Sequence, residues 1–182
     1  PGTQLITLAR SHNAALAAQA AQSGCLLQQV QTDLADPEAA GASAENIMGG
    51  LPQGAQRYLL INNAGMNIEG DFYRGGLERN LQMTKLNMIA PFILSYHFAK
   101  KMAENGGGGI IFTGSISSFK GLPYLTHYAA TKAYVLQLAE GMNYEFKDRN
   151  VDILCLCPGF TITEMTKGLK KNWMTMEVGP VV

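Results

Sequence analysis

The feature that most constrains the fold is an alternation of short apolar runs with longer stretches of helical character. The apolar runs are rich in β-branched residues, which predicts buried strands, and they occupy residues 4–9, 26–32, 57–61, 110–113 and 151–157. Predicted helices lie between them, at residues 13–22, 37–48, 77–105 and 124–147. This order predicts right-handed βαβ units, and therefore an α/β fold with a parallel sheet covered by helices on both faces.

Composition limits the alternatives. A chain of 182 residues with 47% hydrophobic residues is long enough for one domain with a substantial core. Lysine plus arginine and aspartate plus glutamate both number 14, so no basic field points to a nucleic-acid partner. No apolar run approaches the roughly 18–20 residues of a membrane span. We therefore expect residues 1–182 to form a single domain, with no nucleic-acid partner and no membrane span.

Cysteine usage indicates a reducing compartment. The three cysteines, Cys25, Cys155 and Cys157, are odd in number, and two of them lie one residue apart. That spacing suits neither a disulfide nor a metal site, so we expect reduced core cysteines in a cytoplasmic protein.

Polar residues and turn formers follow the predicted strands. Asp33, Asn62–Gly65, Ser115 and Pro158-Gly159 each stand at the carboxyl end of one of them. Open parallel sheets bind ligands beyond these ends. The coincidence predicts one site assembled from several distant segments.

A tyrosine and a lysine give this site a candidate chemistry. In a helix, Tyr128 and Lys132 stand at i and i+4 on one face, and Ser115 ends the strand before them. The ammonium group favours the ionised phenol, so we predict a pKa of Tyr128 below its usual value of about 10. A phenol tuned in this way would exchange a proton with a substrate oxygen.

Several neighbouring side chains match this chemistry less well. Tyr96 and Lys100 have the same spacing, but Met83 stands thirteen positions before the tyrosine, so we interpret this pair as a helix-surface contact. Successive helical residues point about 100° apart, which turns His127 away from Tyr128. We expect structural or exposed positions for His12 and His97. The hydroxyls of Ser117 and Ser118 could take the place of Ser115, but the spacing to Tyr128 favours Ser115.

In this order and spacing the residues resemble the short-chain dehydrogenase/reductase family, from Leu5 to about Met165. The matching motifs are Asn62-Asn63-Ala64-Gly65, Asn87 twenty-two positions after Gly65, the set Ser115, Tyr128 and Lys132, and Pro158-Gly159 with Thr163. The resemblance implies a Rossmann-like doubly wound parallel sheet in three αβα layers. It also implies an NAD(P)-dependent oxidoreductase that moves a hydride between nicotinamide and a small carbonyl or alcohol substrate. The implied activity is that of a ketone reductase, and the implied assembly is a homodimer or homotetramer.

The resemblance also implies roles for the catalytic residues. Tyr128 would be the general acid/base, Ser115 would bind the substrate oxygen, and Lys132 would bind the nicotinamide ribose. Asn87 would hold a water that relays protons to Lys132. Pro91, four residues on, has no N–H, so the carbonyl of Asn87 loses its helical partner and becomes a natural water ligand; a plain helix kink is the alternative.

The cofactor-binding residues that the resemblance implies are Arg10, Asp33, Leu34, Asn63, Ala64, Gly65, Tyr128, Lys132, Pro158, Gly159, Thr161 and Thr163. Arg10 resembles the basic residue that meets the 2′-phosphate of NADP, and no acid stands beside it, which favours NADP over NAD; a solvated surface arginine is the alternative. Asp33-Leu34 resembles the adenine contact, although aspartate at a strand end also forms turns and helix caps.

The chain departs from the family pattern at both ends. The first strand and its glycine-rich turn, which cradles the phosphates, are absent, and Gly106–Gly109 is no substitute because it leads into a strand. The missing strand belongs between those ending at Ala9 and Ile61, which predicts a gap in the middle of the sheet. The chain also stops before the family's last strand and helix. We expect a fragment that binds dinucleotides weakly, and a non-catalytic scaffold on the same fold is the alternative function.

The segments that would choose a substrate are residues 66–76 and those after Thr163. The apolar character of these segments favours a hydrophobic ketone as substrate, such as a steroid-, acyl- or aromatic-type carbonyl. Either a substrate pocket or the packing of a terminal helix accounts for Met165, Trp173, Met174 and Met176.

Overall fold

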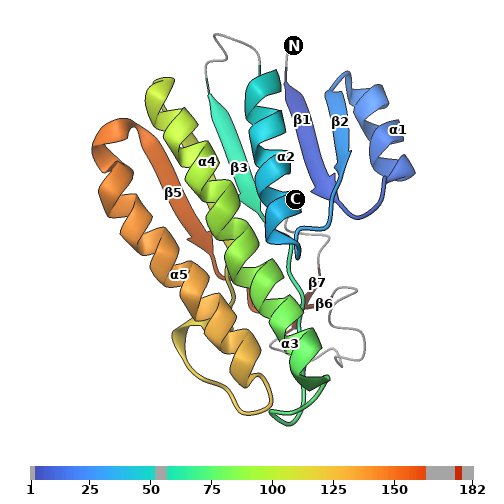
Figure 1. Ribbon diagram of the computed structural model, residues 1–182, viewed down its shortest axis with the longest axis vertical. Coiled ribbons are helices and arrows are strands. Elements are labelled where there is room, and N and C mark those ends of the chain that lie inside the picture. Colours follow the sequence, from blue (N-terminus) through green and yellow to red (C-terminus); the bar gives the residue numbers. More distant parts are fainter. Residues whose placement is uncertain (1–2, 52–56, 163–174, 178–182) are drawn as a thin grey trace.

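The computed structural model describes residues 3–51, 57–162 and 175–177, and it contains the strands that the sequence predicts. The main strands are β1 (Gln4–Ala9), β2 (Leu26–Gln31), β3 (Tyr58–Asn62), β4 (Gly108–Thr113) and β5 (Val151–Leu156). The helices are α1 (Ala14–Ser23), α2 (Pro37–Gly50), α3 (Gly76–Thr84), α4 (Ala90–Glu104) and α5 (Thr126–Phe146). Strands and helices alternate along the chain (Figure 1), so the α/β prediction is confirmed.

Local signals set the ends of the first helices. The side chain of Asn13 caps α1, and Gly24 ends that helix in the left-handed region with φ of 69°. Asp36 caps α2 by accepting backbone hydrogen bonds from its first turn, just ahead of Pro37. None of the described helices combines the length and the hydropathy that a membrane crossing requires.

The parallel strands form two separate main sheets. β1 pairs with β2, and β3, β4 and β5 pair in that order. Within the described residues no strand joins β1 to β3. Figure 1 shows β1 and β3 pointing the same way, with α2 between them in this view. The gap predicted from the family's strand order is therefore present. A further small pair, β6 (Phe160–Ile162) and β7 (Thr175–Glu177), is too short to leave a sequence pattern.

One hydrophobic core joins the two main sheets. Ala44 and Ile47 of α2 are buried in the same cluster as Leu60 of β3, and the half-buried side chains of Ile6 and Val30 from β1 and β2 pack against it. Full burial of one aliphatic side chain contributes about 1.5–3 kcal/mol. Packing under α2 thus holds the sheets together where strand pairing does not.

Helices cover both faces of the strands, but unequally. α2, α4 and α5 lie on one face (Figure 1). α1 packs on the opposite face at β2, where the side chain of Gln29 accepts a hydrogen bond of 2.7 Å from the N–H of Asn13. Farther along that face Leu59, Ile61 and Leu154 are 62%, 57% and 56% exposed. The predicted three-layer order is complete over β2, while the outer face of β3, β4 and β5 lies open in the described part of the chain.

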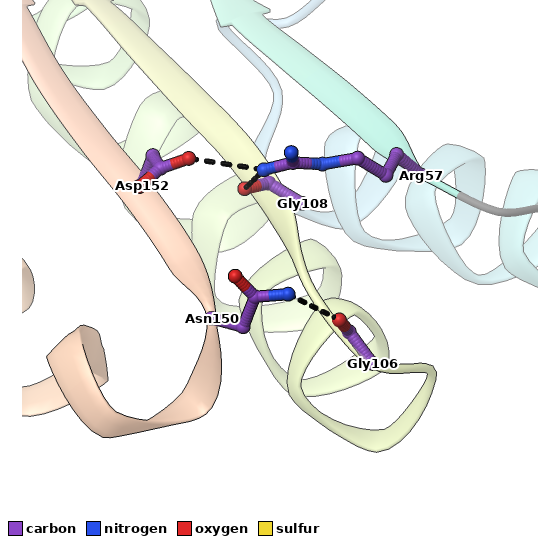
Figure 2. A network of polar contacts seen from close by, with 5 residues as sticks. All are labelled: Arg57, Gly106, Gly108, Asn150 and Asp152. Atoms are coloured by element: carbon purple, nitrogen blue, oxygen red, sulfur yellow. Dashed lines mark hydrogen bonds and ion pairs between the residues drawn. The ribbon is translucent and has the colours of Figure 1, made fainter.

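Polar contacts tie together the end of the three-stranded sheet that lies away from the predicted site (Figure 2). Nη2 of Arg57 lies 3.0 Å from Oδ2 of Asp152 on β5 and 3.4 Å from the carbonyl oxygen of Gly108 on β4. Asn150 donates from Nδ2 to the carbonyl of Gly106 at 2.7 Å. These contacts fix where β4 enters between β3 and β5.

The glycine run before β4 is partly strand, whereas the sequence predicts that Gly106–Gly109 is a linker and that the strand begins at Ile110. β4 begins at Gly108. A Cβ on Gly108 would lie 2.5 Å from Cγ of Met102 and 2.8 Å from the carbonyl oxygen of Tyr58. The glycine is needed because α4 packs directly on the strand backbone.

Candidate active site

The predicted helix over residues 77–105 is interrupted before Pro91 rather than at it. Residues Lys85–Ile89 form a π turn, in which the N–H of Ala90 donates to the carbonyl of Lys85. Pro91 follows at the start of α4 and has no N–H to donate to Asn87. Such turns insert an extra residue into a helix and are frequent at functional sites. Here the turn carries Asn87, which is only 2% exposed.

The side-chain amide of Asn87 binds two other segments of the protein. Its Nδ2 donates to the carbonyl of Met66 at 2.9 Å and to Oγ1 of Thr131 at 3.0 Å. Its Oδ1 accepts from the N–H of Met66 at 2.9 Å. Thr131, in turn, donates to the carbonyl of Tyr128 at 2.8 Å. Asn87 therefore links the loop after β3 to α5. The sequence did not reveal Thr131, although its position three residues after Tyr128 was a usable signal.

Ser115 stands at the end of β4 and reaches Tyr128. Its side chain lies close enough to the phenol of Tyr128 to lower the pKa of that group, and its Oγ accepts from the N–H of Ser117 at 3.1 Å. Ser118 makes different contacts, because its hydroxyl donates to the carbonyl of Lys132 at 2.9 Å and accepts from the N–H of Ser115 at 3.1 Å. Ser118 thus fastens the end of β4 to α5, and Ser115 is the hydroxyl that faces the tyrosine.

Lys132 is buried beside the tyrosine. Its side chain is 6% exposed, and Nζ lies 5.8 Å from the centre of the Tyr128 ring. Nζ donates to the carbonyl of Thr113 at 2.7 Å. Burial lowers the pKa of Lys132, and the neighbouring thiols of Cys155 and Cys157 partly oppose this shift.

The predicted acidification of Tyr128 is wrong for this structure. Burial raises the pKa of Tyr128 above its usual value, and the nearby side chain of Ser115 only partly offsets it. The prediction placed the ammonium next to the phenol oxygen. In the structure the ammonium faces the ring and donates to the carbonyl of Thr113.

Gly65 keeps the centre of the site free of a side chain. A Cβ on Gly65 would lie 3.3 Å from Oδ1 of Asn87 and 3.6 Å from Nζ of Lys132, so a side chain there would fill the space between them. Two buried oxygens, Oδ1 of Asn62 and Oδ1 of Asn67, have no hydrogen-bond partner among the described residues. The open backbone at Gly65, beside the ammonium of Lys132, fits a dinucleotide, which carries ribose hydroxyls.

The other predicted cofactor residues lie at strand ends. Arg10 and Asp33 are exposed after β1 and β2, and Oδ1 of Asp33 accepts from the N–H of Ala35 at 2.9 Å. Leu34 is 8% exposed and belongs to the core, which leaves Asp33 as the accessible side chain of that pair.

A second group of predicted cofactor residues surrounds the ends of β3, β4 and β5. Ala64 is exposed, and Asn63 accepts from the hydroxyl of Thr113 at 3.2 Å. Pro158 and Gly159 are half-buried, and Thr161 donates to the carbonyl of Gly159 at 3.2 Å. The predictions for Thr163, Met165, Trp173 and Met174 fall outside the described residues, as does the side chain of Met176.

The alternative tyrosine–lysine pair and the neighbouring histidine lie elsewhere. Tyr96 is 64% exposed on α4, and Lys100 is exposed as well. Nε2 of His127 lies 2.9 Å from Oγ1 of Thr84 and 3.2 Å from the carbonyl oxygen of Asn80. The histidine therefore connects α5 to α3 and does not reach the phenol of Tyr128 in the contacts it makes.

The chain is similar to proteins of one family. The profile described as short chain dehydrogenase matches residues 1–173. A 2-dehydro-3-deoxy-D-gluconate 5-dehydrogenase from Pseudoalteromonas atlantica is 28% identical over 142 residues, which are 78% of this chain and 55% of the relative. The chain spans about half the length of the curated relatives it matches.

Solved structures give the same picture. A short-chain dehydrogenase from Sphingobium yanoikuyae in complex with NADPH has a TM-score of 0.86 and 31% identity, covering 99% of this chain and 72% of that one. A bulky-bulky ketone specific alcohol dehydrogenase from Comamonas testosteroni has a TM-score of 0.80 and 28% identity, covering 93% of this chain and 67% of that one.

Proposed function

The chain belongs to the short-chain dehydrogenase family, and from this premise we propose that it is an NADP-dependent reductase of ketones. One observation carries the proposal: Ser115 lies close enough to Tyr128 to lower the pKa of its phenol, and Nζ of Lys132 lies 5.8 Å from the tyrosine ring. A hydroxyl, a phenol and an ammonium group in this arrangement suit proton delivery to a carbonyl oxygen. Ser115 would hold that oxygen while Tyr128 donates its proton.

The raised pKa of Tyr128 supports the reductive direction. A phenol with a raised pKa is protonated at neutral pH and is ready to act as an acid. The alkoxide that develops during carbonyl reduction is a much stronger base than a phenolate, so proton transfer from Tyr128 is downhill. The reverse reaction would have to ionise the half-buried phenol first.

The described residues offer a set of contacts for the cofactor, which supplies the hydride when bound. An ammonium group has three N–H donors. Lys132 donates one of them to the carbonyl of Thr113, which leaves two for ribose hydroxyls. Gly65 leaves backbone accessible beside it. Arg10 is exposed at the end of β1, where it would meet a 2′-phosphate. The NADPH complex of the Sphingobium yanoikuyae relative supports the choice of NADP over NAD.

For the substrate we propose a bulky apolar ketone. Phe72 and Tyr73 are 66% and 86% exposed and contact each other edge to face, with ring centres 5.6 Å apart. Tyr124 is 64% exposed, and its carbonyl accepts from the N–H of Gly70 at 2.9 Å. Aromatic rings therefore stand near the N-terminus of the helix that carries Tyr128. The bulky-bulky ketone specificity of the Comamonas testosteroni relative agrees with this substrate class.

Location and assembly are proposals as well. The three cysteines are free thiols, which fits work in the reducing cytoplasm. The exposed rings of Phe92 and Tyr96 on α4 offer an apolar surface for a homodimer or homotetramer.

The test is NADPH oxidation by the natural full-length protein with a panel of bulky ketones. Tyr128→Phe removes only the hydroxyl, and turnover should fall by about 10²–10⁴-fold while NADPH binding is retained. Tyr96→Phe is the matched control, since it has the same lysine spacing on an exposed helix surface. Unchanged turnover in Tyr128→Phe would end the proposal.

A non-catalytic binding or scaffold role is the competing candidate. It is favoured by the gap between β1 and β3, where the family's phosphate-cradling turn belongs. Calorimetric titration of the full-length protein with NADPH and with NAD separates the two functions. Absence of binding would favour the scaffold, whereas binding together with tyrosine-dependent turnover would exclude it.

A further inference from the structure

Two thiols lie side by side behind the proposed catalytic residues. Cys155 and Cys157 share one face of β5 and its extension, because side chains two apart on a strand point the same way. Their sulfurs are 3.8 Å apart. Both side chains are half-buried free thiols, and Cys155 packs against the core as the sequence predicts.

The neighbouring backbone is shaped around both sulfurs. A Cβ on Gly114 would lie 2.8 Å from Sγ of Cys155 and 2.9 Å from Sγ of Cys157, so no larger residue fits without displacing them. Gly114 stands between Thr113 and Ser115 at the end of β4. The thiol pair therefore touches the short segment that positions the proposed catalytic serine.

Strand geometry disfavours a direct disulfide and favours a single bridging atom. Residues two apart on a strand have Cα atoms about 6.4–6.8 Å apart, which is the upper end of the usual disulfide range of about 4.4–6.8 Å. A tetrahedral centre with metal–sulfur bonds of about 2.3 Å places neighbouring sulfurs about 3.8 Å apart. The two thiols already have this separation, at 3.8 Å.

We propose that Cys155 and Cys157 form a dithiol site that holds one thiophilic centre, a soft metal ion or a trivalent arsenical, across both sulfurs. With a divalent metal ion, two metal–sulfur bonds form and two thiol protons are released. With an organoarsenic oxide, two arsenic–sulfur bonds form, the arsenic–oxygen bond breaks, and the oxygen leaves as water with both thiol protons. Neither reaction transfers electrons.

The surroundings fit a centre that needs only two protein ligands. Among the described residues no three His, Cys, Asp or Glu side chains converge on a metal position, so solvent would complete the coordination of a metal ion. Burial and the neighbouring Cys157 raise the pKa of Cys155 to about 11. The resting Cys155 thiol is therefore protonated.

Occupation of the site would reach the catalytic segment. A centre bonded to both sulfurs sits against Gly114 and displaces Ser115, and the new thiolates lie close enough to attract the ammonium of Lys132. We therefore expect loss of turnover on binding. This consequence rests on the proposed function, whereas binding itself does not.

The experiment adds phenylarsine oxide to the native protein without cofactor or substrate. Mass spectrometry should find one phenylarsenic group per chain, and thiol titration should find two of the three thiols lost. Peptide mapping should place the group on the peptide that holds Cys155 and Cys157. A parallel titration with Cd²⁺, followed by thiolate-to-metal charge-transfer absorbance, tests the metal arm.

Single-thiol variants test the bridging geometry. Cys155→Ala and Cys157→Ala should each lose about 100-fold or more in affinity, because one sulfur no longer benefits from the effective concentration of the other. Cys25→Ala should bind normally, since Cys25 lies just before β2, where its Sγ is 3.6 Å from the carbonyl of Thr3. Circular dichroism checks that each variant is folded. If a variant is not folded, the peptide map of the unaltered protein decides whether the group is bound to Cys155 and Cys157.

The same measurements can overturn the proposal. An adduct that maps to Cys25, that keeps its affinity in Cys157→Ala, or that forms only after denaturation would rule out the site. Binding by Cd²⁺ alone or by the arsenical alone would assign the site to that class of ligand. Because no step uses NADPH, a failure of the reductase proposal leaves these outcomes unaffected.

Discussion

At Tyr128, burial and the neighbouring Ser115 act on the pKa of the phenol in opposite directions, and burial is the larger effect. Reduction needs the protonated phenol, so its kcat/KM should stay level over roughly pH 6–9 and fall only above the raised pKa. Alcohol oxidation needs the phenolate, so its rate should rise with pH across the same range. Ser115→Ala removes the contact that lowers the pKa and should move the rise in oxidation to higher pH.

Paired pH–rate profiles of ketone reduction and alcohol oxidation check this prediction. Lys101→Met, which changes a lysine on α4 away from the site, provides a control for general charge effects. A reduction rate that already declines near neutral pH would contradict the raised pKa of Tyr128 and would support the lowered pKa that the sequence predicts.

Gly114 supports a stability prediction. In Gly114→Ala the new methyl group meets both cysteine sulfurs, and overpacking of this kind costs about 1–3 kcal/mol of unfolding free energy. Gly121→Ala is the matched control, because nothing lies within 4 Å of a Cβ there. Urea unfolding measures both. If a triple variant with Cys155→Ala and Cys157→Ala does not recover the lost stability, the sulfurs are not the cause.

Single residues also show which properties of the site could not be predicted from the sequence. The spacing of Ser115, Tyr128 and Lys132 was enough to predict that these side chains meet. The direction of the tyrosine pKa was not predictable, because it depends on how deeply the fold buries the ring and on where the ammonium points. Thr131 was not predicted for a related reason: it accepts a hydrogen bond from the amide of Asn87, forty-four positions away in sequence.

At the scale of elements, the π turn Lys85–Ile89 aims Asn87 at Met66 and Thr131. Pro91→Ala restores a backbone N–H, which allows the turn to relax toward an α-helix. Loss of the extra residue would rotate Asn87 by about 100° away from its partners. Turnover should therefore fall, while the free energy of unfolding changes by less than about 1 kcal/mol, since the restored N–H offsets the smaller side chain.

Steady-state kinetics and thermal unfolding of Pro91→Ala test the turn. Pro37→Ala makes the same exchange at the first position of α2, far from Asn87 in the chain, and should leave turnover unchanged. Equal activity in both variants would mean that the π turn does not depend on the proline or that Asn87 does not depend on the turn.

Elements long enough to show a period were predictable, and short ones were not. The runs behind β1, β2, β3 and β5 located these strands to within a residue or two. β4 began earlier than predicted, because a glycine can join a strand when a helix packs on its backbone. The proline predicted a break in the long helix, but the type of break depends on the hydrogen bonds that Asn87 finds elsewhere.

At the scale of the whole molecule, the order of the strands was predictable, but the packing that joins the two sheets was not. The gap between β1 and β3 followed from the family's strand order. The way the two sheets stay together did not, because it rests on one buried cluster that contains Ala44 and Ile47 and against which residues from different strands pack. β1 and β3 consequently share a core while each keeps an edge without a strand partner among the described residues.

Those two edges support the last prediction. Residues 1–182 should bind NADPH weakly. Fusion of a first strand, glycine-rich turn and first helix of the family pattern ahead of Thr3 should strengthen binding by about 100-fold or more, since each hydrogen bond to a charged phosphate contributes roughly 1.5–3 kcal/mol. The added strand would pair with β1 and β3, and the turn would present N–H groups to the pyrophosphate. A second fusion with alanines in place of the turn's glycines should raise the unfolding midpoint as much and strengthen NADPH binding far less. Equal gains in affinity from both fusions would show that closing the sheet, and not cradling the phosphates, is what the dinucleotide requires.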